Sequence, residues 1–223
     1  MLNTSRIVVT GAAGTLGRAV ARRAHAYGAE VVGLDIVPGI ELEWLARYTA
    51  VDLTDRAATL AAVEAIGPVD ALVNVAGGFA MGVDAAEPDD EQWNWMFRIN
   101  VETLRNAVMA VVPLLRARGG GRIVNIGALG ALSGQGAMSA YCSAKSTVMR
   151  LTESLSEELK GAGINVNAVL PSIIDTPPNR EAMPDADFDQ WVHPDQLAEV
   201  ICFLASDRAR AVHGALLPVK GLV

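Results

Sequence analysis

The sequence carries little charge and few aromatic side chains. Of its 223 residues, 19% are charged and 5% are aromatic, whereas 51% are hydrophobic. The 18 basic residues are outnumbered by 25 acidic ones, and the strongest basic run, Arg22 and Arg23 with Arg18 one turn earlier, is interpreted as a solvated helix face. Because a nucleic-acid-binding surface needs a basic face to neutralise phosphates, this composition argues against a nucleic-acid partner.

Cysteines and long apolar runs are also scarce. Cys142 and Cys202 stand 60 positions apart without metal-ligand spacing, so no metal site is predicted and a reducing compartment is favoured. The longest apolar run, 107–115, has nine residues including a proline, whereas a membrane-spanning helix needs about 20. The first six residues hold no apolar core of signal-peptide length. We therefore expect a cytoplasmic protein with no membrane partner.

Short β-branched runs alternate with longer segments of helical periodicity. Strands are predicted at 6–10, 30–34, 48–51, 70–74, 122–126, 164–169 and 215–219. Helices are predicted at 16–27, 55–66, 91–118 (broken near 98–100), 139–160 and 195–205. The strands are too apolar to face water, so helices must cover both of their faces. The pattern predicts an α/β fold with a single domain over 1–223, built on a doubly wound parallel sheet of about seven strands.

One long segment, about 171–193, lacks regular periodicity and is rich in proline. No linker or internal repeat divides the rest of the chain. A loop of that length inside a compact domain is more often functional than idle, so we expect it to be a substrate loop.

Three glycines spaced three apart, Gly11, Gly14 and Gly17, separate the first strand from the first helix. Glycines at this place let the backbone turn tightly and approach a pyrophosphate, while the helix N-terminus offers free N–H groups. Asp35 ends the second strand, where a carboxylate accepts hydrogen bonds from ribose hydroxyls and repels a 2′-phosphate. The pattern predicts a dinucleotide site that prefers NAD(H) over NADP(H). The alternative is a glycine turn used for packing, with Asp35 an ordinary surface acid.

Two further segments follow strands at the same predicted edge of the sheet. Asp52, after the third strand, is either an adenine contact or a helix-capping acid. The segment Asn74-Val75-Ala76-Gly77-Gly78 ends the fourth strand, and its small residues let a ligand lie over the carboxyl edge of the sheet. We expect this segment to contact the cofactor.

Tyr141 and Lys145 are four residues apart, so a helix brings their side chains to one face. A free tyrosine, with a pKa of about 10, is a poor acid–base catalyst at neutral pH. A neighbouring ammonium favours the phenolate and should lower the pKa of Tyr141 toward the working range. Alone, such a pair is usually a surface feature, but beside a dinucleotide site it indicates catalysis.

Together these motifs resemble the short-chain dehydrogenase/reductase family, and the resemblance covers essentially all 223 residues. It rests on the glycine loop, the Asn74 segment, Asn100, the strand Ile123-Val124-Asn125-Ile126, Tyr141 with Lys145, and Pro171. The resemblance implies a Rossmann-type fold in which Tyr141 gives or takes the proton. It implies that Lys145 holds the nicotinamide ribose and that Asn100 holds a helix kink and a water.

The residues expected to contact the cofactor combine the sequence patterns with this resemblance. They are Gly11, Gly14, Thr15, Leu16, Gly17, Asp35, Asp52, Leu53, Asn74, Ala76, Gly77, Ile126, Tyr141, Lys145, Pro171, Ile174 and Thr176. Of these, Ile174 and Thr176 would meet the nicotinamide carboxamide.

The chain departs from the family pattern at two places. The common branch spaces its glycines G-x-x-x-G-x-G, whereas here they fall three apart. The family usually has a serine thirteen residues before the tyrosine, where its hydroxyl polarises the substrate carbonyl, and here that position is Ala128. Such a donor is typically worth about 2.7–4 kcal/mol of barrier. Ser133 or Ser139 could substitute, although they are more simply explained as turn and helix-capping serines.

Dihydropteridine reductase-like members of the family resemble this chain in both departures. The similarity extends over 75–82 and through the loop at 170–191. It implies reduction of a conjugated, pteridine-like acceptor, which needs a carbonyl-polarising serine less. Phe79, Met81 and Trp191 are then candidates for an aromatic–apolar wall against a flat ring near Ala128, or else for plain core and lid packing.

Three functions remain open from the sequence. The preferred one is an NAD-dependent reductase of a small conjugated substrate. The second is an ordinary alcohol dehydrogenase or carbonyl reductase in which Ser133 or a water replaces the missing hydroxyl. The third is a catalytically silent NAD-binding sensor or assembly protein.

The family resemblance further implies a homodimer or homotetramer that pairs the helices around 101–118 and 139–160. The first of these helices has apolar positions that suit such an interface or, equally, an internal core. They are Val108, Val111, Val112 and Leu115.

Overall fold

The computed structural model describes residues 1–82, 84–87 and 89–223. Within these residues the centre is one parallel sheet of seven strands, in the order β3-β2-β1-β4-β5-β6-β7. The strands are β1 (Arg6–Thr10), β2 (Glu30–Asp35), β3 (Arg47–Ala50), β4 (Ala71–Asn74), β5 (Gly121–Ile126), β6 (Ile164–Pro171) and β7 (Leu216–Val219). The predicted parallel sheet is confirmed, with every strand end within two residues of its predicted position.

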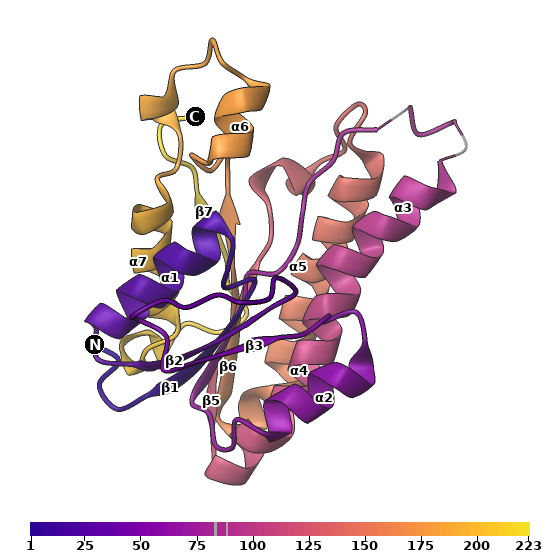
Figure 1. Ribbon diagram of the computed structural model, residues 1–223. Coiled ribbons are helices and arrows are strands. Elements are labelled where there is room, and N and C mark those ends of the chain that lie inside the picture. Colours follow the sequence, from indigo (N-terminus) through magenta and orange to yellow (C-terminus); the bar gives the residue numbers. More distant parts are fainter. Residues whose placement is uncertain (83, 88) are drawn as a thin grey trace.

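Helices cover both faces of this sheet (Figure 1). They are α1 (Thr15–Ala26), α2 (Arg56–Glu64), α3 (Asp90–Phe97), α4 (Thr103–Arg118), α5 (Ser139–Leu159), α6 (Pro177–Ala182) and α7 (Pro194–Leu204). On one face α1 and α7 pack together, and Val20 and Ile201 belong to the same buried cluster. On the other face α2, α4 and α5 share a second cluster that includes Val111 and Val148.

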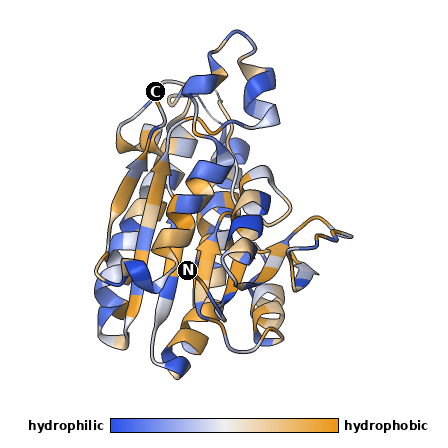
Figure 2. Cartoon of the chain, turned by 90° about the vertical axis from the view of Figure 1, so that its left-hand side faces the viewer, coloured by the Kyte–Doolittle hydropathy of each residue, from blue (hydrophilic) through white to orange (hydrophobic). Residues whose placement is uncertain are grey.

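The composition of the strands explains this layering. Ile7, Val8 and Val9 follow one another along β1 and are each at most 1% exposed, because helices cover the strand from both sides. Figure 2 shows strongly hydrophobic strands between helices that carry hydrophilic stretches. A strand buried on both faces cannot alternate polar and apolar residues, which is the pattern that predicted a parallel sheet.

The long helical region predicted over 91–118 contains a π-helical turn, Arg98–Glu102, between α3 and α4. The predicted break near 98–100 is therefore a widened turn within a continuous helical stretch. At its centre lies Asn100, 1% exposed, whose Nδ2 donates to the carbonyl oxygen of Met96 at 3.1 Å. Such widened turns are frequently found at functional sites.

The carboxyl ends of the strands form the edge at which a ligand is expected. From β1 the chain proceeds to β2 and β3 on one side, and it then crosses to β4 on the other side. Doubly wound sheets bind ligands in the crevice where the strand order reverses in this way. The segment that contains α6 stands beyond the end of β6 (Figure 1). Among the described residues, no helix is long and apolar enough to span a membrane.

Candidate active site

Two of the three glycines at the junction of β1 and α1, Gly11 in the loop and Gly17 in the first turn of α1, are required by the close packing there. Gly11 has φ +66°, and a Cβ built there would lie 2.7 Å from the backbone nitrogen of Ala76. A Cβ on Gly17 would lie 1.9 Å from the carbonyl oxygen of Gly11. Gly14 has φ −76° and its Cβ would meet nothing closer than 3.4 Å. Gly11 and Gly17 therefore allow β1, α1 and the end of β4 to meet, whereas Gly14 keeps the outer side of the loop open.

Gly17→Ala is expected to lower the free energy of unfolding by about 3 kcal/mol or more, because its Cβ would overlap a backbone oxygen that cannot move aside without shifting the loop. Gly14→Ala is the matched control, and its ordinary φ predicts a change within about 1 kcal/mol. Urea denaturation measures both values. Equal losses in the two variants, or an unchanged Gly17→Ala protein, would contradict this account of the loop.

The N-terminus of α1 faces the open side of the loop. The N-cap residue, Gly14, makes no side-chain hydrogen bond, and Thr15 is exposed. Within the described residues, the backbone N–H groups of Thr15, Leu16 and Gly17 have no protein acceptor. Free N–H groups at the positive end of a helix attract anions. The open side of the loop at Gly14, next to these donors, fits the pyrophosphate of a dinucleotide.

Asp35 lies beside this loop, as predicted from its place at the end of β2. Its side chain is 9% exposed, so it is a buried acid and not the ordinary surface acid of the alternative. Oδ2 accepts a hydrogen bond from the backbone nitrogen of Ala13 at 2.9 Å, and Oδ1 accepts one from that of Val37 at 3.1 Å.

Asp52 and Leu53 follow β3 in the predicted place. Asp52 is exposed, and its Oδ1 accepts from the backbone nitrogen and the hydroxyl of Thr54, both at 2.8 Å. The alternative of a helix-capping Asp52 is wrong, because the N-cap of α2 is Asp55. Leu53 is buried, and its carbonyl oxygen accepts from Nδ2 of Asn106 at 2.9 Å.

A row of polar side chains supports the segment after β4. Thr10, Asn74 and Asn125 stand at one register across β1, β4 and β5. Nδ2 of Asn74 donates to Oδ1 of Asn125, whose Nδ2 donates to the hydroxyl of Thr152, both at 2.9 Å. The hydroxyl of Thr10 accepts from the backbone nitrogen of Ala76 at 3.1 Å. Asn74 is 3% exposed, so its side chain holds the strand ends in place beneath the predicted cofactor.

Asn100 and Lys145 meet at the glycines that follow. Nδ2 of Asn100 donates to the carbonyl oxygen of Gly78 at 3.0 Å, and its Oδ1 accepts from the Gly78 nitrogen at 3.2 Å. Lys145 is 7% exposed, and Nζ donates to the carbonyl oxygen of Ile126 at 3.0 Å. A Cβ on Gly77 would lie 2.6 Å from Oδ1 of Asn100 and 3.5 Å from Nζ of Lys145. The structure thus brings these predicted residues together around one stretch of backbone.

Tyr141 lies one turn before Lys145 on α5, and both side chains are affected by burial. Burial raises the pKa of Tyr141 to about 12 and lowers the pKa of Lys145 to about 8. The prediction that Lys145 lowers the pKa of Tyr141 is wrong here, because burial dominates and the ammonium is turned to the Ile126 carbonyl. At neutral pH the phenol therefore holds its proton firmly.

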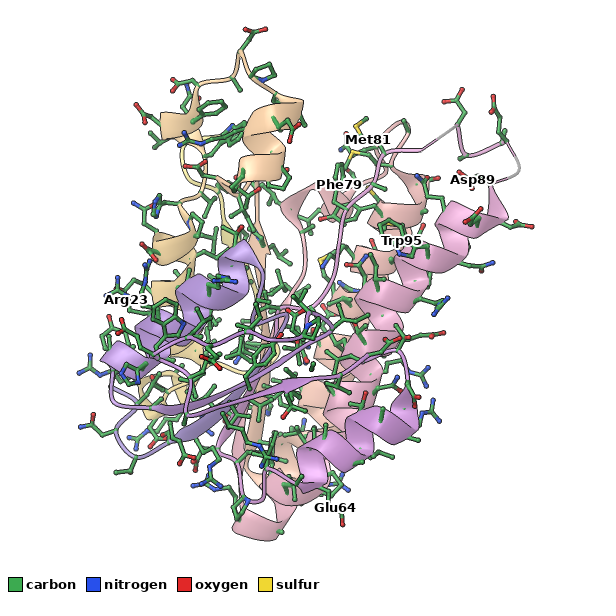
Figure 3. All side chains as sticks on the ribbon, in the orientation of Figure 1. Arg23, Glu64, Phe79, Met81, Asp89 and Trp95 are labelled. Atoms are coloured by element: carbon green, nitrogen blue, oxygen red, sulfur yellow. The ribbon has the colours of Figure 1, made fainter. Side chains whose placement is uncertain are left out.

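Phe79 and Met81 form an apolar margin beside Tyr141. The rings of Phe79 and Tyr141 pack edge to face, with centroids 4.9 Å apart and an interplanar angle of 86°. Phe79 is 50% exposed, and Met81, further along the same segment, is 60% exposed (Figure 3). The backbone nitrogen of Gly82 donates to the carbonyl oxygen of Ala137 at 2.8 Å, which ties this segment to the loop before α5.

The position of the family serine is apolar. Ala128 is 5% exposed and belongs to a buried cluster with Cys142 and Met149. Tyr141 packs against this cluster, so a methyl group stands at the position where the family usually has a hydroxyl.

Ser133 and Ser139 have other surroundings. Ser133 is exposed, and its hydroxyl accepts from Nε2 of Gln135 at 3.2 Å, as a turn serine would. Ser139 is the first residue of α5, and the helix-capping interpretation is wrong because the N-cap is Met138, which makes no side-chain hydrogen bond. Neither serine occupies the place of Ala128.

The predicted substrate loop has more regular structure than its sequence suggests. Pro171 ends β6, and Ile174 pairs with Val192 in an isolated bridge. Thr176 is the N-cap of α6 and accepts from the backbone nitrogen of Asn179 at 3.4 Å. Proline at the first helical position and a threonine cap both favour a helix start, which explains this short helix.

Trp191 lies inside this loop and not at its surface. It is 6% exposed, and its ring centroid is 4.8 Å from that of Phe188. The guanidinium of Arg180 lies over the other ring, 4.5 Å from the centroid of Phe188. The prediction of a wall that joins Trp191 to Phe79 and Met81 is therefore wrong for Trp191, which packs the loop internally.

One residue of this region, Arg18, has a role that its sequence pattern did not indicate. The solvated-face interpretation suits Arg22 and Arg23, which form ion pairs with acidic residues of α7, and Figure 3 shows Arg23 at the outer side of α1. It is wrong for Arg18, whose Nε donates to the carbonyl oxygen of Ala13 at 2.7 Å. Its position directly after Gly17, in the first turn of α1, was the available signal.

Comparison with known proteins agrees with this geometry. Residues 5–187 match the family model described as short chain dehydrogenase. L-xylulose reductase from Bos taurus is 32% identical over 233 residues, which cover 97% of this chain and 95% of that relative.

Solved structures place the chain in the same group. Carveol dehydrogenase from Mycobacterium avium in complex with NAD is 28% identical, with a TM-score of 0.88 over 99% of this chain and 97% of that one. A protein described as an NAD(P)-dependent gluconate 5-dehydrogenase from Beutenbergia cavernae, with bound NADP, is 29% identical, with a TM-score of 0.90 over 99% and 96%. The chain therefore belongs to the short-chain dehydrogenase family and is an oxidoreductase that binds a nicotinamide cofactor.

Proposed function

We propose that this enzyme reduces a small, planar, conjugated acceptor of the pteridine type with NADH, and that Tyr141 delivers the proton. The observation that carries the proposal is the apolar cluster around Ala128, which removes the usual hydroxyl donor. An isolated carbonyl concentrates negative charge on one oxygen as hydride arrives, so it depends on such a donor. A conjugated system spreads that charge over several atoms and depends on the donor less.

The residues around Tyr141 have separable roles in this proposal. The nicotinamide supplies the hydride when it is bound. Tyr141 holds the proton at its phenol oxygen, and Lys145 places a positive charge one helical turn away, close to Gly77. Asn100 fixes the backbone of Gly78 and thereby the path of the chain above Lys145. The exposed margin of Phe79 and Met81 offers an apolar surface to a flat ring.

In this proposal the cofactor lies along the carboxyl edge of the sheet. We assign its pyrophosphate to the α1 N-terminus at Gly14–Gly17, its adenosine to Asp35 with Asp52 and Leu53, and its nicotinamide half to the Asn74–Gly77 segment, Ile126 and 171–176. Asp35 favours NAD(H), because its buried carboxylate would repel a 2′-phosphate.

A second candidate function is that of an ordinary alcohol dehydrogenase or carbonyl reductase. The relatives favour it, since their names give L-xylulose and carveol as substrates. In that case Tyr141 would act with a water in place of the missing hydroxyl.

Ala128→Ser separates the two candidates. We expect kcat/KM for quinonoid dihydropterin and for simple ketones to change by less than about fivefold, because chemistry that never used a donor gains little from one. Ala131→Ser, which adds a hydroxyl to the same buried cluster, is the matched control. The assay follows NADH oxidation. A gain of about 100-fold or more on ketones alone would support the carbonyl enzyme and contradict the proposal.

We also propose that the enzyme is a homodimer or homotetramer paired through α4 and α5. Three of the four apolar α4 positions considered for this interface, Val108, Val111 and Leu115, are at most 5% exposed and serve the core of the subunit instead. Exposed apolar side chains nearby on α3 and α4 are those of Trp93, Trp95 and Met109. Light scattering of the purified protein distinguishes these assemblies from a monomer.

A further inference from the structure

The carboxylate of Asp35 is already bound to two backbone segments before any ligand is considered. One oxygen accepts from the nitrogen of Ala13 in the glycine loop, and the other accepts from the nitrogen of Val37 in the turn after β2. The residue is 9% exposed, so removing the charge would leave two N–H groups short of an acceptor in a place with little water. These hydrogen bonds to Ala13 and Val37 are not required for binding a ribose, so they indicate a second role for the carboxylate.

Ala13 is held at its nitrogen and at its carbonyl oxygen by charged groups. Its nitrogen donates to Asp35 at 2.9 Å, and its carbonyl oxygen accepts from Nε of Arg18 at 2.7 Å. Hydrogen bonds with one ionised partner are stronger than neutral ones. The Asp35 carboxylate and the Arg18 guanidinium therefore restrain Ala13, in the middle of the loop, through its nitrogen and its oxygen.

Tyr48 is influenced by both Asp35 and Arg18. Its hydroxyl donates to the carbonyl oxygen of Val37, so the Val37 residue is held by Asp35 at its nitrogen and by Tyr48 at its oxygen. Burial raises the pKa of Tyr48, the carboxylate of Asp35 raises it further, and the guanidinium of Arg18 lowers it. Hydrogen bonds through Ala13 and Val37 thus link all three side chains between the glycine loop and the end of β2.

We propose that Asp35 and Arg18 act as a clamp on Ala13, one at its nitrogen and the other at its carbonyl oxygen, and that this clamp sets the shape of the glycine loop. Asp35 is then a positioning residue for the pyrophosphate site as well as a ribose acceptor. This inference concerns cofactor binding and holds whichever acceptor the enzyme reduces. It has a consequence for specificity. Removing the charge of Asp35 disorganises the loop, so the change weakens NAD binding without creating affinity for NADP.

Ligand binding tests the clamp with three probes on purified protein. In Asp35→Ser we expect NADH affinity to fall by about tenfold or more, and NADPH affinity to stay at or below that of the wild type. Reduced nicotinamide mononucleotide has a phosphate but no adenosine ribose. Its affinity should fall by a similar factor in Asp35→Ser, because the loop that binds phosphate has lost its anchor. Arg22→Met, an exposed α1 arginine that pairs with Asp195, is the control for all three probes.

Hydrogen exchange supplies a readout that needs no ligand. In Arg18→Met the acceptor of the Ala13 N–H group is untouched. We nevertheless expect that amide to exchange about tenfold faster, because Ala13 then keeps only the hydrogen bond at its nitrogen. Asp35→Asn, which keeps one oxygen acceptor, should restore part of the NADH affinity lost in Asp35→Ser.

Three outcomes would overturn the clamp. One is a gain of NADPH affinity in Asp35→Ser. Another is an unchanged affinity for the mononucleotide alongside weakened NADH binding, which would limit Asp35 to a ribose contact. The third is unchanged Ala13 exchange in Arg18→Met. None of these results bears on which acceptor is reduced, so failure of the clamp remains distinct from failure of the proposed function.

Discussion

Tyr141→Phe is expected to lower kcat by about 10²- to 10⁴-fold, the range that a positioned general acid contributes. The phenylalanine keeps the edge-to-face contact with Phe79 and the packing against the Ala128 cluster, so only the proton-bearing oxygen is removed. Because the raised pKa of about 12 keeps the phenol protonated at neutral pH, the wild type has this proton available throughout the assay range. Single-turnover measurement of NADH oxidation isolates the chemical step.

Tyr27→Phe is the matched control for this experiment. Tyr27 lies at the end of α1 and donates its hydroxyl hydrogen to Glu199, away from the sheet edge that holds Tyr141. Its loss should leave kcat unchanged. NADH affinity in Tyr141→Phe should stay within about threefold of the wild type. A kcat that falls by less than about tenfold would mean that another group delivers the proton.

Lys145→Met is expected to abolish most activity. It should also remove the destabilising effect of a buried ammonium on the free energy of unfolding. The buried ammonium has its pKa lowered from 10.5 to about 8 by burial. That difference corresponds to about 3 kcal/mol of lost stability at neutral pH, where the lysine is charged in both the folded and the unfolded state. Methionine removes this cost, although it also leaves the Ile126 carbonyl without its donor, which costs about 1–3 kcal/mol.

The pH dependence of stability separates these two effects. Between about pH 8 and 10.5 the unfolded wild type binds more protons than the folded one, so wild-type stability rises with pH across this window. The lost hydrogen bond is the same at every pH. The stability of Lys145→Met relative to the wild type should therefore decline by about 3 kcal/mol from pH 7 to pH 10.5.

Urea denaturation at several pH values measures this decline. The same substitution at the exposed Lys220 serves as the control. A difference between Lys145→Met and the wild type that stays constant with pH would contradict the assignment of a desolvated, easily deprotonated ammonium at this position.

The layers of the fold and the core of the site could be predicted because local physics determines them. A buried parallel strand has to be apolar on both faces, so short continuous apolar runs identified the strands in the sequence. The positive φ of Gly11 and the close contact at Gly17 exclude side chains, so glycines at the start of a helix indicate this loop in the sequence. One turn of helix separates Tyr141 from Lys145, and that spacing alone places them on the same face.

Other features depend on contacts that no local pattern reveals. Helical periodicity identified an apolar face on α4, but it could not show that Val108, Val111 and Leu115 meet the sheet of their own subunit. Trp191 could have faced a substrate, and only the tertiary structure shows it packed against Phe188. Arg18 looked like a member of a solvated basic face because its partner is a backbone carbonyl, which has no signature in the sequence.

The pKa of Tyr141 could not be predicted from the sequence either. The sequence places a lysine one turn away, which favours the phenolate. The depth at which the two groups are buried is a property of the folded chain, and here it raises the tyrosine pKa and lowers that of the lysine.

The central claim, that the site around Ala128 serves a conjugated acceptor, is tested most directly by the choice of substrate. Purified wild-type protein is given NADH with quinonoid dihydropterin in one series and with L-xylulose and a set of simple ketones in the other, and kcat/KM is measured for each from NADH consumption. The account predicts turnover of the pterin with kcat/KM at least about 100-fold above that of any ketone, because the apolar margin of Phe79 and Met81 fits a flat conjugated ring and offers a small ketone little contact. Turnover of ketones or L-xylulose without turnover of the pterin would contradict it and assign the enzyme to the carbonyl reductases.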